Sequence, residues 1–142
     1  MRNGVGVSAV LVGLGAALGA PTGGVAAGAF DGTWNATVIC ADYGDVKGYS
    51  WSFPVRVRGG ALSGKYVNPN DALNFGELSG TIDGGGNALL TMNGSTGLSE
   101  YNVHHEAAHT RVHYRASAHF EAQSGAGKRL EQRPCDLSFS KT

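Results

Sequence analysis

Apolar and polar residues alternate in several short runs along the chain, and glycine-rich segments separate these runs. Successive side chains of a β-strand point to opposite faces, so alternation with a period of two predicts a strand that buries one face. The alternation is regular over residues 50–58, where the apolar side chains share one face: Trp51, Phe53, Val55 and Val57. The chain therefore predicts short antiparallel strands rather than helices.

The runs that predict strands cover residues 33–40, 50–58, 62–67, 77–82, 87–92, 110–120 and 135–140. About seven or eight short strands are typical of an up-and-down β-barrel or a small sandwich. The segment Asp83-Gly84-Gly85-Gly86 predicts a tight hairpin between two of these strands. Pro54 has no amide hydrogen to donate, so we expect it at a sheet edge or a bulge.

In the longest run, residues 110–120, apolar and polar side chains fall on opposite faces. The apolar face carries Val112, Tyr114, Ala116, Ala118 and Phe120. The opposite face carries His113, Arg115, Ser117 and His119. We therefore expect this strand to turn its first face to the interior and its second face to solvent.

Residues 1–29 have the regions of a secretory signal peptide. Arg2 gives a short positive start, residues 5–20 are apolar, and Ala27-Gly28-Ala29 fits the A-x-A cleavage pattern. Cleavage after Ala27 and an uncleaved membrane anchor are the alternatives, but an apolar stretch this short and glycine-rich rarely spans a bilayer. The sequence thus predicts export to the periplasm or beyond, a single domain of residues 30–142, and no stable membrane insertion after cleavage.

Cys40 and Cys135 lie near the two ends of the predicted domain. An exported domain with an even number of cysteines predicts a disulfide bond, whereas zinc-binding thiolates usually occur in C-x-x-C pairs. The bond would place the first and last strands side by side, and a meander with adjacent terminal strands is a closed barrel. We therefore predict an all-β fold, a single antiparallel up-and-down barrel of about eight strands closed by this disulfide.

The net charge of the chain bears on which classes of binding partner it attracts. The chain has 11 basic and 11 acidic side chains, and loss of Arg2 with the signal peptide leaves ten basic and eleven acidic, a net charge of −1. This balance gives no general electrostatic attraction for nucleic acid or an anionic membrane surface. We expect no nucleic-acid partner.

The segment Phe30-Asp31-Gly32-Thr33-Trp34 resembles the G-x-W start of the first strand in calycins, the superfamily of lipocalin and avidin-like barrels. This resemblance implies that the Trp34 indole plugs one end of the barrel beneath a basic residue from near the last strand. Arg133 and Lys141 are the candidates for that residue. The resemblance bears on architecture, because the residues of a biotin site have no match here.

Residues 30–142 as a whole resemble a group of small exported alphaproteobacterial proteins of the bradyrhizobial type. The likeness is carried by the same start with Cys40 shortly after it, and by the segments Gly125-Ala126-Gly127-Lys128-Arg129 and Arg133-Pro134-Cys135. It implies a fold and an exported compartment. Small periplasmic inhibitors of metalloproteases are similar in architecture, so an inhibitor-like barrel is one alternative function.

Residues 105–109 match the H-E-x-x-H pattern of zinc metallopeptidases. On a helix, His105 and His109 would lie one turn apart to bind Zn²⁺, and Glu106 would act as general base on the bound water. Zincins hold this pattern in a long helix and supply a third ligand further along the chain. Here a helix has room only over residues 99–109 and shows no apolar stripe. We therefore predict a connection into the next strand, with a zinc metallopeptidase as the alternative.

Five histidines lie within sixteen residues: His104, His105, His109, His113 and His119. A surface Zn²⁺ or Cu²⁺ site formed by His105, His109 and His113, or a pH-responsive patch, is chemically reasonable. The simpler interpretation is a solvent-facing polar surface that happens to use histidine. We predict no cofactor, with zinc as the alternative.

The segment Ser124-Gly125-Ala126-Gly127-Lys128-Arg129 is close to a phosphate-binding loop. It lacks the first glycine of G-x-x-x-x-G-K-[ST], and Arg129 stands where the Mg²⁺-binding hydroxyl should be. We expect a glycine turn here, with Lys128, Arg129 and Arg133 on a solvated face.

These observations favour a non-catalytic exported barrel that binds an unknown small molecule or protein. The candidate ligand site is the barrel interior or mouth, lined by Trp51, Phe53, Val55, Tyr114 and Phe120. An eight-stranded barrel is either filled by side chains or holds one small ligand, and the sequence leaves both open. If side chains fill the interior, the outer surface must act, as an interaction or inhibitor module.

Overall fold

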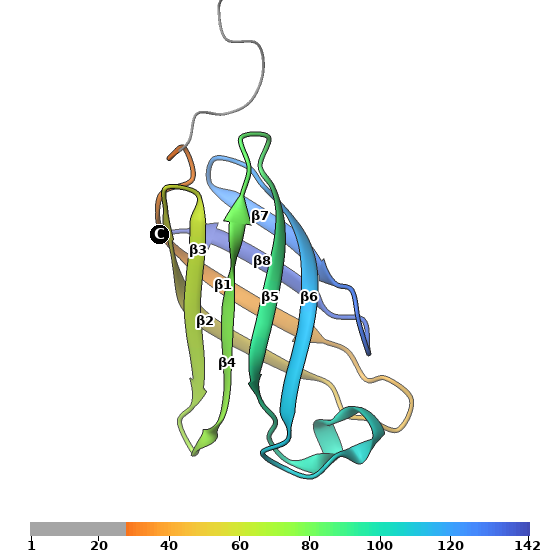
Figure 1. The fold of residues 1–142 in the computed structure, drawn as a ribbon. Coiled ribbons are helices and arrows are strands. Elements are labelled where there is room, and N and C mark those ends of the chain that lie inside the picture. Colours follow the sequence, from red (N-terminus) through yellow and green to blue (C-terminus); the bar gives the residue numbers. More distant parts are fainter. Residues whose placement is uncertain (1–27) are drawn as a thin grey trace, which may run out of the picture.

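Antiparallel strands follow one another around a closed barrel in chain order in the computed structural model, which describes residues 28–142 (Figure 1). The strands are β1 (Gly32–Cys40), β2 (Tyr49–Arg58), β3 (Ala61–Asn68), β4 (Asp71–Ile82), β5 (Asn87–Ser95), β6 (Arg111–Phe120), β7 (Ser124–Arg129) and β8 (Asp136–Lys141). The predicted eight-stranded all-β barrel is confirmed. The predicted signal peptide, residues 1–29, falls almost entirely outside the described residues.

The barrel closes where β1 pairs with β8, from Trp34 opposite Lys141 to Ile39 opposite Asp136. The predicted disulfide between Cys40 and Cys135 lies beside the end of this ladder. It links residues 95 positions apart in the sequence. The barrel is therefore closed both by the disulfide bond and by the hydrogen bonds between β1 and β8.

The two ends of the barrel carry different connections (Figure 1). Short turns join β2 to β3, β4 to β5 and β6 to β7 at one end, which we call the plugged end. The longer connections, residues 41–48, 96–110 and 130–135, lie at the other end, together with the tight β3–β4 turn. We call this end the mouth. Residues 96–110, the mouth loop, contain two short 3₁₀ turns, η1 (Ser99–Tyr101) and η2 (Val103–His105).

Aromatic side chains fill the barrel at the plugged end. The Trp34 indole is fully buried, and its Nε1 donates a 2.8 Å hydrogen bond to the carbonyl oxygen of Phe30. The ring meets Phe120 edge-on, with centroids 5.4 Å apart. Lys141 lies above the indole, its Nζ 5.7 Å from the ring centroid. Of the two predicted basic partners of Trp34 it is thus Lys141 that lies there, since Arg133 is at the mouth beside Tyr49.

The alternation predicted for residues 110–120 is confirmed. Along β6 the inward positions from Tyr114 to Phe120 are buried and the outward positions from His113 to His119 are exposed. Pro54 lies immediately beyond the β2–β3 ladder, which begins at the pair Val55 and Gly64, as expected for a residue without an amide hydrogen.

The prediction of a glycine turn over residues 124–129 is wrong, because these residues form strand β7. The glycines allow close packing against β6. A Cβ atom at Gly125 would lie 2.9 Å from the Phe120 ring, and one at Gly127 would lie 2.6 Å from the carbonyl oxygen of Ser117. Glycine thus marks a close approach between strands here, not a break in the strand.

Within residues 28–142, the longest helical segments are single 3₁₀ turns, and no helix there has the length and apolar character to cross a bilayer.

Candidate functional site

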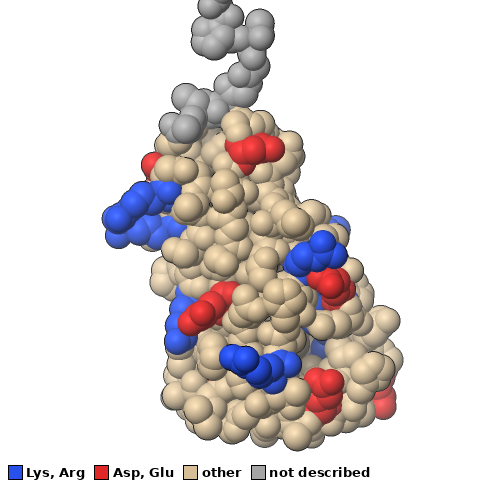
Figure 2. Space-filling model, in the orientation of Figure 1, with Lys and Arg blue, Asp and Glu red and all other residues tan. Residues whose placement is uncertain are grey.

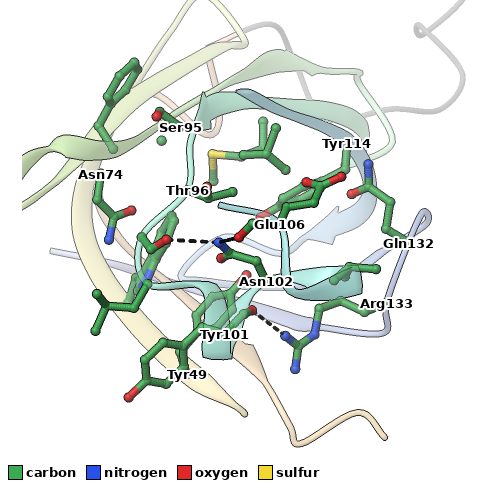
Figure 3. Close-up of a pocket in the computed structure, with 18 of the residues that line it drawn as sticks. Tyr49, Asn74, Ser95, Thr96, Tyr101, Asn102, Glu106, Tyr114, Gln132 and Arg133 are labelled. Atoms are coloured by element: carbon green, nitrogen blue, oxygen red, sulfur yellow. Dashed lines mark hydrogen bonds between the residues drawn. The ribbon is translucent and has the colours of Figure 1, made fainter. Parts of the chain in front are cut away.

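A cavity of about 640 Å³ opens at the mouth of the barrel. Its walls come from the mouth ends of β2 to β7, from the mouth loop, and from the segment that follows β7 (Figure 3). The barrel interior is thus divided, with packed side chains at the plugged end and a cavity at the mouth. The sequence leaves open whether side chains fill the interior or leave room for a small ligand. The first alternative applies to the plugged half, and the second applies to the mouth half.

The five predicted lining residues divide between these two halves. Trp51 and Tyr114 line the cavity. Phe53, Val55 and Phe120 are buried in the packed core, each at most 3% exposed. All five point inward, as the alternation predicts. Which of them reach the cavity depends on their height along the barrel axis, and alternation alone does not report that height.

One wall of the cavity is a stack of aromatic rings. Trp51 and Tyr66 lie nearly parallel, with centroids 4.4 Å apart and an angle of 14° between the rings. Tyr49 also stacks against Trp51, with centroids 5.3 Å apart. Neighbouring positions on β2 and β3 supply these rings where the two strands have separated, since the β2–β3 ladder ends at Val55. The wall offers a flat apolar surface of the kind on which planar groups stack.

Two arginines form part of the wall next to Tyr49, and the prediction that they lie on a solvated face is wrong. Arg129 is 8% exposed and Arg133 is 3% exposed. The Arg129 guanidinium lies 3.8 Å from the centroid of the Tyr114 ring. Burial raises the pKa of the Tyr114 hydroxyl and lowers the pKa of Arg129. The charged residues around position 130 gave no indication of this burial, because they show no alternation with apolar residues.

Asn102 organises the mouth loop from within. Its side-chain Nδ2 donates hydrogen bonds to the carbonyl oxygens of Gly97, at 2.9 Å, and Glu106, at 2.8 Å (Figure 3). The side chain is buried, so these bonds replace lost contact with water. Thr96 adds backbone pairing with His109 and Thr110 at the base of the loop. The loop is therefore an ordered part of the cavity wall.

The H-E-x-x-H segment does not form a zincin helix. His104, His105 and His109 have positive φ angles, and the chain after η2 is irregular up to a turn at Ala108 and His109. His105 Nε2 lies 2.9 Å from an oxygen of Asp45, and His109 Nε2 lies 2.7 Å from an oxygen of Asp71. The two imidazoles thus bind carboxylates on different parts of the mouth instead of converging on one metal position.

The remaining histidines also have separate partners. His113 Nδ1 lies 2.5 Å from the Asn93 side-chain oxygen, and His119 contacts Asn87 and Glu121. The alternative metal set of His105, His109 and His113 is not brought together. Within residues 28–142, no three His, Cys, Asp or Glu side chains gather in a way that could hold a metal ion.

Basic and acidic side chains are interspersed over the face of the molecule shown in Figure 2. Ion pairs also join separate segments of the chain, as Lys47 does with Glu100 at 2.8 Å. That pair joins the β1–β2 connection to the mouth loop. The buried charges of this protein lie inside the mouth, whereas the charges on the face shown in Figure 2 are of mixed sign.

No protein-family model, curated protein or solved structure matches this chain. The geometry of the cavity is therefore the basis of the proposed function.

Proposed function

We propose that this protein is a binding module that holds one small molecule in the mouth cavity without transforming it. The observation that carries the proposal is the division of the interior. Side chains fill the half around Trp34, while the half around Trp51 and Tyr114 encloses a cavity of about 640 Å³. Ligand cavities in proteins typically measure about 300–1,000 Å³ and combine apolar walls with a few buried polar groups.

The rim of the cavity supports binding from solution. Leu98 in the mouth loop lines the cavity and is 64% exposed, and Val103 lies beside it in the same loop. Apolar residues at a rim favour entry of an apolar or amphipathic molecule, because they remove part of its surface from water as it enters. The ordered loop behind them gives a largely preformed site.

The separated histidines support a non-catalytic function. Glu106 lines the cavity, yet His105 and His109 bind carboxylates elsewhere. A general base of a zincin needs a metal-bound water held by both histidines. This arrangement offers no such position for Glu106.

We place this binding module outside the cytoplasm and relate it to calycin-like barrels. The Cys40–Cys135 disulfide is consistent with an oxidising compartment, and the signal-like residues 1–29 support export. The contact of Lys141 with Trp34 at the plugged end supports the calycin-like relationship.

Binding of N-phenyl-1-naphthylamine, an uncharged fluorophore that brightens in apolar sites, tests the proposal. We expect saturable binding to the purified protein and its loss in Val112→Trp, because Val112 lines the cavity and an indole there would fill it. The matched control is Val67→Trp, at a position that is 44% exposed on β3. Absence of saturable binding, or equal binding by Val112→Trp and wild type, would overturn the proposal.

A further inference from the structure

Two buried positive charges border the mouth cavity without an acidic partner. Arg129 and Arg133 both line the cavity, and no Asp or Glu carboxylate oxygen lies within 4 Å of either guanidinium in the described part of the chain. Arginine stays protonated in proteins, and a buried charge is costly unless an opposite charge accompanies it. The protein therefore carries uncompensated positive charge at this wall.

The polar partners of Arg133 are all neutral carbonyl groups. Its terminal nitrogens donate to the carbonyl oxygens of Tyr101 at 3.1 Å, Ala41 at 2.5 Å and Lys47 at 3.4 Å. The bond to Tyr101 is drawn in Figure 3, and together these bonds fasten the mouth loop to the β1–β2 connection. The Nε atom of Arg133 is buried and has no hydrogen-bond partner.

Arg129 also has only neutral acceptors. Its guanidinium donates to the Glu131 carbonyl oxygen at 2.8 Å, to the Gln132 side-chain oxygen, and weakly to Cys135 Sγ at 3.9 Å. Tyr114 covers one face of the guanidinium. Burial lowers the pKa of Arg129, although the neighbouring Tyr49 and Tyr114 act in the opposite direction.

About half of the residues that line the cavity are polar or charged, and one more of their side-chain atoms is also unpaired. The side-chain oxygen of Asn74 on β4 is buried without a hydrogen-bond partner, and Asn74 lines the same cavity. Both buried side-chain atoms that lack a partner in residues 28–142 thus belong to this cavity wall. A buried polar atom without a partner is costly in a stable fold and is common where a ligand completes the bonding.

We propose that the ligand is an amphipathic organic anion, a carboxylate or sulfonate on a flat apolar body. The anionic group lies at the wall formed by Arg129 and Arg133, and the apolar body lies on the Trp51–Tyr66 stack. Guanidinium groups bind such anions with charge-assisted hydrogen bonds, which are stronger than neutral ones. This inference rests on the proposed function and specifies its ligand class.

The carboxylate of Glu106 opposes anion binding at this site. It is the only acidic side chain among the described residues that line the cavity, and it is exposed at the rim. A rim carboxylate repels an incoming anion, but solvent screens an exposed charge more effectively than a buried one. Three arginines, Arg111, Arg129 and Arg133, line the cavity with this one carboxylate, so the charged side chains of the lining carry a net positive charge.

A pair of probes with the same aromatic body tests the inference. 8-Anilinonaphthalene-1-sulfonate carries a sulfonate, and N-phenyl-1-naphthylamine lacks it. We expect the sulfonate probe to bind at least about tenfold more tightly, the gain typical of one buried charge-assisted hydrogen bond. Arg129→Gln should reduce this preference to about twofold or less, while Arg129→Lys, which retains the charge, should keep most of it.

The matched control is Arg58→Gln, the same change at an exposed arginine near the plugged end, which should leave both affinities unchanged. Circular dichroism and the absence of free thiols establish that each variant is folded. Equal binding of the two probes by wild type, or an undiminished preference in folded Arg129→Gln, would overturn the anion inference. In that case saturable binding of the neutral probe would leave the proposed function intact.

Discussion

The imidazole of His105 and the carboxylate of Asp45 lie 2.9 Å apart and join two connections at the mouth of the barrel. The hydrogen bond to Asp45 raises the pKa of His105, and the same bond lowers the pKa of Asp45. Both groups are exposed, so the contact is a modest one that depends on solution conditions. It nevertheless connects the mouth loop to the segment that Arg133 also binds.

This contact should make the order of the mouth loop depend on pH. Because folding raises the pKa of His105 above 6.5, its stabilising contribution is complete below about pH 6.5 and is lost as pH rises through the folded-state value. Because folding lowers the pKa of Asp45 below 3.8, its contribution is lost as pH falls through that lower value. The contact is therefore strongest between these limits.

Hydrogen exchange of the mouth-loop amides measures this effect. After correction for intrinsic exchange rates, we expect protection of residues 96–110 to be greater at about pH 6 than at about pH 8. Asp45→Asn should remove most of the difference. The same pH dependence in Asp45→Asn and wild type would show that another group controls the loop.

Removal of the disulfide should destabilise the barrel strongly. The bond between Cys40 and Cys135 spans 95 residues. A loop of this size is worth about 4–5 kcal/mol in the chain-entropy model, so the double variant Cys40→Ala with Cys135→Ala should lose about that much free energy of unfolding in urea. Thiol titration of denatured, unreduced wild type should find no free thiol. A loss below about 1 kcal/mol would mean that the β1–β8 ladder closes the barrel alone.

The two tryptophans should respond differently to truncation. Trp34→Phe removes a buried hydrogen bond to Phe30 and leaves space in the packed half, so we expect a loss of about 2–4 kcal/mol. Trp51→Phe is the matched change beside the existing cavity and should cost about 1 kcal/mol or less. Urea denaturation compares the two. Equal losses would contradict a barrel filled at one end only.

Neutralising the rim carboxylate should strengthen anion binding. Glu106→Gln removes a negative charge from the cavity rim with little change in shape. We expect the affinity for 8-anilinonaphthalene-1-sulfonate to rise about two- to threefold at low salt, and the gain to shrink as salt screens the charge. Affinity for the uncharged probe should not change. A similar gain for both probes would indicate an effect of shape rather than charge.

The same variant separates binding from peptide hydrolysis. If Glu106 were the general base of a zincin, Glu106→Gln would abolish zinc-dependent casein hydrolysis. We expect wild type and variant to give the same rate as buffer with zinc. Hydrolysis by wild type that disappears in the variant would restore the metallopeptidase alternative.

Much of the fold could be predicted because each strand buries one face. The alternation from Val112 to Phe120 and the separation of Cys40 from Cys135 were enough to indicate a closed barrel. Strand β7 was missed because Gly125 and Gly127 have no side chain to report a buried face. Their interior space is taken by neighbours such as Phe120.

The candidate site was only partly predictable. Trp51 and Tyr114 follow from alternation, but Arg129 and Arg133 do not, because their burial depends on carbonyl groups of distant segments. Arg133 reaches the carbonyl oxygen of Ala41, 92 residues away in the sequence. No local pattern records such a contact. Pairing of His105 with Asp45 is hidden for the same reason.

Residues 28 and 142 both lie at the plugged end of the barrel, away from the mouth. Thr142 donates hydrogen bonds to the carbonyl oxygen of Thr33 beside the plugged end, and Asp31 binds the β2–β3 turn at that same end through Gly59 and Gly60. A sensor chip, a fused enzyme or a crystal scaffold joined at either residue 28 or residue 142 would therefore hold the protein with its mouth facing outward. Attachment at these ends would leave the cavity open to the surrounding solution.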